Sequence, residues 1–189
     1  HGLIDFSRQM VKLGVDWLGV DSIIEAVALR RAGIKKNILV LGYTQPTNFR
    51  AAAVDNIVIT ISSLHSLRQF LVMSQPPKFH LKIDTGMHRQ GFLLSDFPQA
   101  IKLLKKVSGD AQLAGVFSHL AGDASEQYAL ATHHQIVGFE KSLEMLARAG
   151  LPRESLVKHL AATSGAIGYP EARYDLARVG MGLYGHWKT

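Results

Sequence analysis

The chain has 189 residues and no cysteine, which excludes a disulfide scaffold, an iron–sulfur cluster and thiol chemistry. It has no apolar run near the roughly 18 residues that a membrane span requires. Charge is sparse: 21 Lys and Arg stand against 15 Asp and Glu, which gives a formal charge of +6. This modest surplus suits an anionic small molecule as well as a polyanion. We expect a globular protein with no membrane partner, and the lack of cysteine is compatible with the cytoplasm.

Motifs of several common sites are also missing. The nine histidines form neither a His-x-x-x-His nor a His-Glu-x-x-His spacing, so we expect no metal site. No Gly-x-Ser-x-Gly frame is present, which argues against a serine hydrolase. The basic cluster Lys102–Lys106 has no interleaved aromatic residues, and we expect no nucleic-acid partner.

Short apolar runs alternate along the chain with longer amphipathic ones. Several of the short runs are rich in Val and Ile and apolar on both faces, which is typical of buried parallel strands. The predicted strands are Asp16–Asp21, Asn37–Tyr43, Ile57–Ser62, Phe79–Asp84, Leu113–His119, Val157–Ala162 and Leu176–Leu183. The predicted helices are Ile4–Leu13, Ser22–Ala32, Thr47–Val54, Leu64–Met73, Phe97–Val107 and Glu126–Ala149.

This alternation predicts an α/β fold with a parallel sheet. About seven strands are visible and the chain opens on a helix, whereas eight strands close a (β/α)8 barrel. We therefore expect residues 1–189 to form one TIM-type barrel domain that lacks its first strand. An open doubly wound sheet is the alternative, but it normally carries a Gly-x-Gly-x-x-Gly turn after its first strand, and the chain has none.

Polar residues follow four of the predicted strands. Barrel enzymes place catalytic groups at such carboxyl-terminal strand ends. Lys82 alternates with Leu81 and Ile83, so it points to the opposite face from them. A lysine inside a barrel needs an anionic partner, such as Asp84, or a changed charge.

The last two predicted strands combine a cation, hydroxyl groups and glycines. Arg178 lies in an otherwise apolar segment, and Gly180 and Gly182 leave bare backbone amides near it. Thr163-Ser164-Gly165 follows the neighbouring strand. In barrels this is the usual place for a phosphate, although glycines can also merely end strands.

These residues resemble the conserved blocks of alanine racemases. The first block is Lys82-x-Asp84-Thr85-Gly86-Met87-x-Arg89-x-Gly91. The second is Asp175-x-x-Arg178-x-Gly180-Met181-x-Leu183-Tyr184-Gly185, and a third is Phe117-Ser118-His119-Leu120-Ala121. The resemblance covers nearly the whole chain in the right order.

The resemblance implies a pyridoxal phosphate enzyme built on an eight-stranded barrel, with a separate β-rich C-terminal domain. Arg178 matches the arginine that hydrogen-bonds the pyridine nitrogen of the cofactor, and Arg89 matches the one near its phenolic oxygen and the substrate carboxylate. Lys82 matches a lysine that is often carbamylated and positions Arg89. His119 matches the histidine between Arg178 and a catalytic tyrosine of the partner subunit. The phosphate-binding positions are matched by Thr163, Ser164, Gly180 and Met181.

The sequence also departs from the family pattern. His1-Gly2 resembles the end of the stretch that carries the cofactor-binding lysine, so we expect this lysine to precede the chain and the C-terminal tyrosine domain to follow it. Thr163 stands where asparagine is usual, and His88 replaces a common glycine. The isolated chain is therefore expected to be inactive.

The function that the resemblance implies is two-base interconversion of L- and D-alanine in a cytoplasmic homodimer, which supplies D-alanine for peptidoglycan. A racemase for serine or another small amino acid is an alternative. A second alternative is a non-catalytic barrel protein that binds pyridoxal phosphate.

Overall fold

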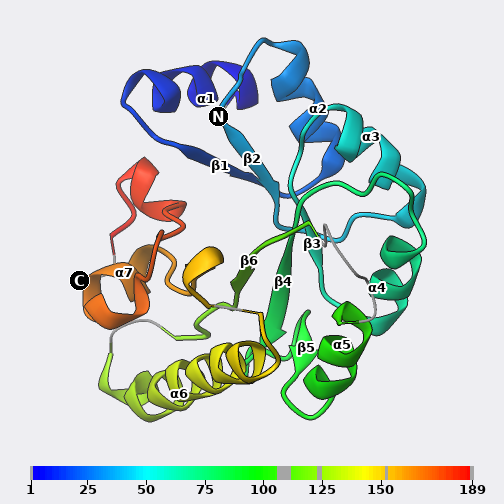
Figure 1. Cartoon of the computed structure of the whole chain (residues 1–189). Helices are drawn as coiled ribbons and strands as arrows, with labels where there is room; N and C mark the ends of the chain where they lie inside the picture. Colours follow the sequence, from blue (N-terminus) through cyan, green and yellow to red (C-terminus); the bar gives the residue numbers. More distant parts are fainter. Residues whose placement is uncertain (1, 106–111, 123–124, 152, 188–189) are drawn as a thin grey trace.

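The computed structural model describes residues 2–105, 112–122, 125–151 and 153–187. Its strands are β1 (Trp17–Val20), β2 (Asn37–Val40), β3 (Ile59–Ile61), β4 (Phe79–Asp84), β5 (Phe92–Leu93), β6 (Leu113–Phe117) and β7 (Val157–His159). Its α-helices are α1 (Leu3–Lys12), α2 (Ile23–Arg31), α3 (Phe49–Val54), α4 (Leu64–Leu71), α5 (Phe97–Leu104), α6 (Glu126–Arg148) and α7 (Thr163–Gly168). Helix and strand alternate through most of the chain, as predicted (Figure 1).

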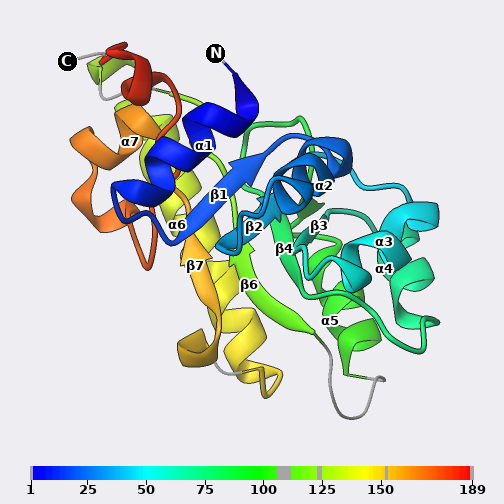
Figure 2. The same ribbon diagram turned by 90° about the horizontal axis from the view of Figure 1, so that it is seen from above.

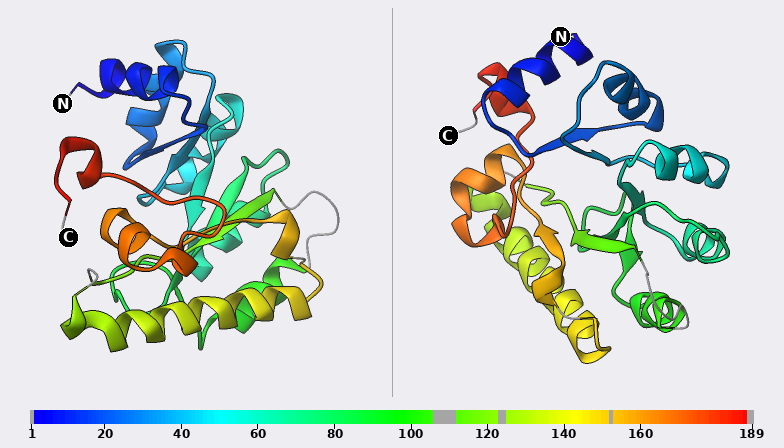
Figure 3. Two further views of the ribbon diagram at one scale, coloured as in Figure 1. Left: turned by 90° about the vertical axis from the view of Figure 1, so that its left-hand side faces the viewer. Right: turned by 45° about the horizontal axis from the view of Figure 1, so that its top comes forward.

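The strands lie side by side in chain order and all their pairings are parallel. β1 pairs with β2, and an isolated bridge between Leu39 and Val58 leads to β3. The order continues as β3, β4, β6 and β7, with the short β5 also paired to β4. A doubly wound sheet would reverse its order at a switch point, whereas a barrel does not. The predicted class, part of a TIM-type barrel with the helices outside the strands, is confirmed (Figure 3).

The two ends of the described chain meet beside the strands. The rings of Phe6 in α1 and Tyr184 in the 3₁₀ turn η4 (Met181–Tyr184) stack with centroids 5.0 Å apart. Figure 2 shows the first helix and the last turn lying next to each other. This contact brings the segment that carries Arg178 back to the side of the barrel where β1 lies.

Residues of β4 alternate between the helix-covered core and the barrel interior. Phe79, Leu81 and Ile83 belong to the hydrophobic core. The intervening His80 and Lys82 are also buried, and they face the interior, where their partners are other polar side chains. This period of two is the geometry of a strand, and it confirms the predicted orientation of Lys82.

The prediction of a strand over Leu176–Leu183 is wrong. In this segment only Arg178 forms a bridge, to Ala162, and the chain then turns into η4. The physical reason is that Gly180 and Gly182 offer no side chains to a sheet, and their amides donate to the Thr163 hydroxyl instead of a neighbouring strand.

One strand, β5, and one α-helix, α7, were not predicted. β5 is only two residues long, and α7 begins at Thr163, directly where a predicted strand ends. The end of the predicted helix Phe97–Val107 lies outside the described residues. Within the part of the chain that the structure describes, no helix is both long enough and apolar enough to cross a membrane.

Candidate functional site

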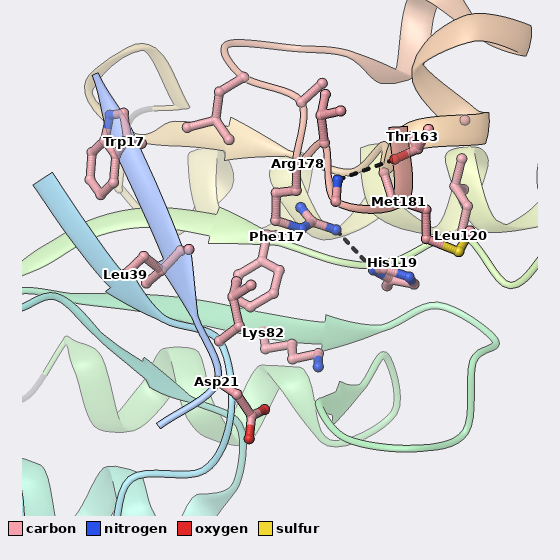
Figure 4. A pocket seen from close by; sticks show the side chains of 18 of the residues that line it. Trp17, Asp21, Leu39, Lys82, Phe117, His119, Leu120, Thr163, Arg178 and Met181 are labelled. Atoms are coloured by element: carbon pink, nitrogen blue, oxygen red, sulfur yellow. Dashed lines mark hydrogen bonds between the residues drawn. The ribbon is translucent and has the colours of Figure 1, made fainter. Parts of the chain in front are cut away.

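A cavity of about 1420 Å³ occupies the barrel interior. Residues of β1, β2, β4 and β6 and of the segment that follows β7 line it. The structure brings every candidate site residue to this one cavity: Lys82, Arg89, His119, Thr163, Ser164, Arg178, Gly180 and Met181. Figure 4 shows Arg178 above the Phe117 ring, with Lys82 on the opposite side of that ring and His119 beside the guanidinium.

Arg178 is fixed by four neutral acceptors. Its Nη1 lies 2.7 Å from Nδ1 of His159. Its Nη2 donates to the carbonyls of Ser118 (2.7 Å) and Leu160 (3.0 Å) and lies 3.1 Å from Nδ1 of His119. Burial lowers the pKa of Arg178 to about 10, so the guanidinium remains a cation at neutral pH. Among the described residues no carboxylate lies within ion-pair distance of it, and its charge is therefore free to act on a ligand.

His119 is held as a neutral imidazole. Its Nδ1 faces Arg178, which can only donate, so the proton of the neutral ring is on Nε2. Burial, followed by the positive charge of Arg178, lowers the pKa of His119 to about 4. His119 therefore enters the cavity as an oriented N–H donor.

Lys82 has a neutral partner. Its Nζ donates to Oε1 of Gln90 at 3.1 Å, and Nε2 of Gln90 donates to the Ser62 hydroxyl at 3.1 Å. Burial first, and then the cations Arg89 and Arg178, lower the pKa of Lys82 to about 8. The ammonium thus lies in the barrel with two like charges and an amide partner.

Asp84 is one of the partners that the sequence suggested for Lys82, but in the structure the two do not pair, and Lys82 contacts Gln90 instead. One carboxylate oxygen, Oδ1, accepts the amides of Gly86 and His88, both at 3.0 Å. Burial alone would raise the pKa of Asp84, but these backbone hydrogen bonds outweigh it and lower the pKa. The carboxylate therefore shapes the loop that leads to Arg89.

The segment around Thr163 supplies hydroxyl and amide groups. Thr163 is buried, and its Oγ1 accepts the amides of Gly180 and Gly182, each at 3.2 Å. Ser164 lies half-buried on the cavity wall, and Met181 is exposed at its rim. These hydroxyl and amide groups lie at the start of α7 and in the segment that carries Arg178.

Sequence reasoning missed several residues of the site. Gln135 in α6 accepts the amide of Ala121 (2.8 Å) and donates to the carbonyl of His119 (3.1 Å), so it clamps the loop of that histidine. No sequence signal distinguishes Gln90 or Gln135 from surface glutamines. His80 could have been found, because it has the same parity in β4 as Lys82.

The buried histidines predict a pH-dependent stability. Burial, with a further contribution from Arg178, lowers the pKa of His80 to about 3 and that of His119 to about 4 from 6.5, and holds the pKa of His159 well below 6.5. Between the folded and unfolded pKa values the unfolded chain binds more protons, so the unfolding free energy should fall as the pH drops below about 6.5. Each fully buried imidazole contributes at most about 1.4 kcal/mol per pH unit.

Urea unfolding of the full-length protein at about pH 7.5 and about pH 5 measures this dependence. The His80→Asn variant should flatten it, whereas His65→Gln, which removes an exposed histidine of α4, should not. Equal stability at both pH values in the wild type would contradict the expectation.

Comparisons with known proteins agree on one family. The family profile described as "Alanine racemase, N-terminal domain" matches residues 1–187. The alanine racemase of Symbiobacterium thermophilum is 33% identical over 191 residues, which are 98% of this chain and 49% of that protein. The alanine racemase of Salinispora tropica is 31% identical over 192 residues, which are 98% of this chain and 50% of that protein.

A solved structure gives the same result at the level of the fold. The crystal structure of alanine racemase from Bacillus anthracis with bound L-Ala-P superimposes with a TM-score of 0.88 at 25% identity, and the match covers 100% of this chain and 49% of that one. This chain therefore spans about half the length of the relatives it matches.

Proposed function

Because this chain belongs to the family of alanine racemase N-terminal domains, we propose that residues 1–189 are the cofactor-binding barrel domain of a pyridoxal phosphate-dependent racemase that interconverts L- and D-alanine. The observation that carries the proposal is the convergence of all eight candidate residues on one cavity around Arg178. Chain position alone does not require this, because these residues come from four separate segments: β4 with the loop after it, the loop after β6, the start of α7, and the segment that carries Arg178.

The residues present fit pyridoxal phosphate. Arg178 is a cation whose four partners are all neutral, which suits a ring nitrogen that must accept a hydrogen bond without taking a proton. The hydroxyls of Thr163 and Ser164 are donors of the kind that bind a phosphate, because the amides of Gly180 and Gly182 donate to Oγ1 of Thr163 and leave its own O–H free to donate. Gly180 has open space where a side chain would begin, so an anion can approach its backbone.

The cofactor, when bound, withdraws electrons from the α-carbon of the amino acid attached to it and so acidifies the α-proton. We assign Arg178 to the ring nitrogen, and Thr163, Ser164, Gly180 and Met181 to the phosphate. Arg89 orients the substrate carboxylate, and Lys82, carbamylated or free, sets the charge beside it. His119 accepts a hydrogen bond from Arg178 at Nδ1 and presents its Nε2 proton to the cavity.

The two proton-transferring bases are proposed to come from outside residues 1–189. Among the candidate site residues the groups that can act as bases are His119 and Lys82, and His119 is engaged by Arg178 and Lys82 by Gln90. A racemase needs a base on each face of the α-carbon, and general-base catalysis contributes about 10²- to 10⁴-fold for each. The isolated chain is therefore expected to lack racemase activity.

The setting of the full-length protein follows from the same proposal. We infer a cytoplasmic homodimer that acts on a small amino acid, with no nucleic-acid or membrane partner, and whose D-alanine product serves peptidoglycan synthesis. Among the described residues no group of three or more His, Asp or Glu side chains is arranged to hold a metal ion, and no metal has a part in the proposal.

The test compares the full-length protein with the isolated 189-residue chain. The full-length protein should bind pyridoxal phosphate, detected by visible absorbance and by mass spectrometry, and should convert L- to D-alanine. L-Serine assayed in parallel separates the two substrate classes. A full-length protein that binds no cofactor would refute the proposal, and turnover by the isolated chain above that of free cofactor would place a base within residues 1–189.

A further inference from the structure

Two buried histidines that have no part in the proposed reaction form a pair behind Arg178. His80 in β4 and His159 in β7 are both 0% exposed. Nδ1 of His80 lies 2.8 Å from Nε2 of His159, and Nδ1 of His159 lies 2.7 Å from Nη1 of Arg178. The three side chains therefore form one continuous hydrogen-bonded chain from His80 to Arg178, which lines the cavity.

The direction of this chain is fixed by Arg178. A guanidinium has no acceptor, so Nδ1 of His159 must carry the lone pair and, in the neutral ring, Nε2 must carry the proton. Nε2 of His159 then donates to Nδ1 of His80. This leaves the proton of the neutral His80 ring on Nε2, so the tautomers of both rings follow from geometry alone.

The far end of the chain has no partner. Nε2 of His80 is buried without a hydrogen bond in the described part of the chain. The absent side chain of Gly115 leaves room for it, since a Cβ there would lie 2.7 Å from that nitrogen. A buried N–H without an acceptor costs free energy, so folding stability alone does not account for a histidine at position 80.

Aromatic rings hold both imidazoles in place. The Phe117 ring stacks on His159 with centroids 4.6 Å apart and planes only 6° from parallel. Trp17 packs against His80 at 5.4 Å. Arg178 lies over the same Phe117 ring, with its Cζ 5.2 Å from the ring centroid. Both imidazoles of the pair are therefore packed between aromatic rings.

We propose that His80 and His159 are positioning residues that present Arg178 to the cofactor as an oriented donor without reducing its charge. This rests on the proposed function, since it assigns the pair a task toward the same cofactor. An aspartate at position 159 would hold the guanidinium equally well but would neutralise it. Two neutral imidazoles in series orient the cation and leave its field intact. Their burial, which lowers the pKa of both rings, is consistent with this role.

The test uses the full-length protein and two substitutions of the same residue. His80→Leu removes the acceptor of the His159 proton, whereas His80→Asn keeps an acceptor oxygen near the position of Nδ1. Thr60→Val is the matched control, because Thr60 pairs with His80 in the sheet register and its buried hydroxyl donates to Val40, away from Arg178.

The first readout is the ¹⁵N NMR spectrum of histidine-labelled protein, which reports the protonated nitrogen of each ring. The wild type should show His80 and His159 protonated at Nε2 alone. The second readout is the affinity for pyridoxal phosphate, titrated by absorbance. It should weaken about tenfold in His80→Leu, as expected for impaired positioning of one charged hydrogen bond, and should recover in His80→Asn.

The possible outcomes distinguish a failure of this inference from a failure of the proposed function. A wild-type ring protonated at Nδ1, or doubly protonated, would overturn the inference, and this measurement needs no variant to fold. Equal affinities in His80→Leu and the wild type, or equal losses in His80→Leu and Thr60→Val, would overturn it as well. If the wild type binds no pyridoxal phosphate, the proposed function fails and the assignment of the pair to the cofactor fails with it.

Discussion

Replacing Arg178 with glutamine is expected to reduce racemisation by the full-length protein about 10²- to 10³-fold, the usual effect of removing one preorganised donor from an active site. Glutamine keeps polarity at the position but removes the positive charge. It also cannot satisfy four acceptors, so His159, His119 and the carbonyls of Ser118 and Leu160 would lose their shared donor. Lysine would preserve the charge but not the planar fork, and it should rescue only part of the loss.

Steady-state assays of L- to D-alanine conversion measure this effect. We expect kcat to fall more than KM for alanine rises, because Arg178 is assigned to the cofactor and not to the substrate. Arg173→Gln is the matched control: Arg173 lies on the same segment, is exposed, and donates to the carbonyl of Ala166. Activity of Arg178→Gln within a few-fold of this control would refute the assignment.

Replacing Gly91 with alanine is expected to lower the free energy of unfolding by about 3 kcal/mol or more. Gly91 has a φ of +140°, a conformation that L side chains rarely adopt. A Cβ would also lie 2.6 Å from the amide nitrogen of Asp84 and 2.7 Å from the carbonyl carbon of Ile83, both of which are backbone atoms of β4. Neither neighbour can move without breaking the pairing of β4 with β5.

Denaturant unfolding of the full-length protein measures the loss. Gly180→Ala is the control for stability, because Gly180 has a φ of −120° and nothing lies within 4 Å of its missing Cβ. Activity of Gly91→Ala should also fall, since Arg89 and Gln90 immediately precede the displaced residue. A Gly91→Ala protein as stable as Gly180→Ala would show that the close approach of these two strands is not required.

The sequence predicted the barrel because its strongest signals are local. Buried parallel strands are apolar on both faces, and six of the seven predicted runs contain an observed strand. Leu176–Leu183 was the exception: its residues are equally apolar, but its glycine amides bond to Thr163, a partner distant in sequence. Hydropathy cannot reveal such a contact.

The candidate site was predictable in its members but not in its pairings. Motif residues mark which side chains converge, and Lys82, Arg89, His119 and Arg178 do line one cavity. Which acceptor each cation takes depends on how the loops fold, and the loop after β4 brings Gln90 back to Lys82, so the pairing of Lys82 with Gln90 instead of Asp84 could not be foreseen. The histidine pair was hidden for the same reason, because β4 and β7 meet only through β6.

The grouping of Lys82, Arg89 and Arg178 around one cavity, with a neutral amide as the partner of Lys82 and only neutral groups as the partners of Arg178, has a kinetic consequence. Field lines concentrate where like charges line a concave, low-dielectric wall, so anions that diffuse nearby are drawn toward the opening before any contact forms. Added salt shortens the range of this attraction to about 10 Å at 0.1 M. The entry rate of a phosphate ester should therefore slow with ionic strength while its escape rate changes little.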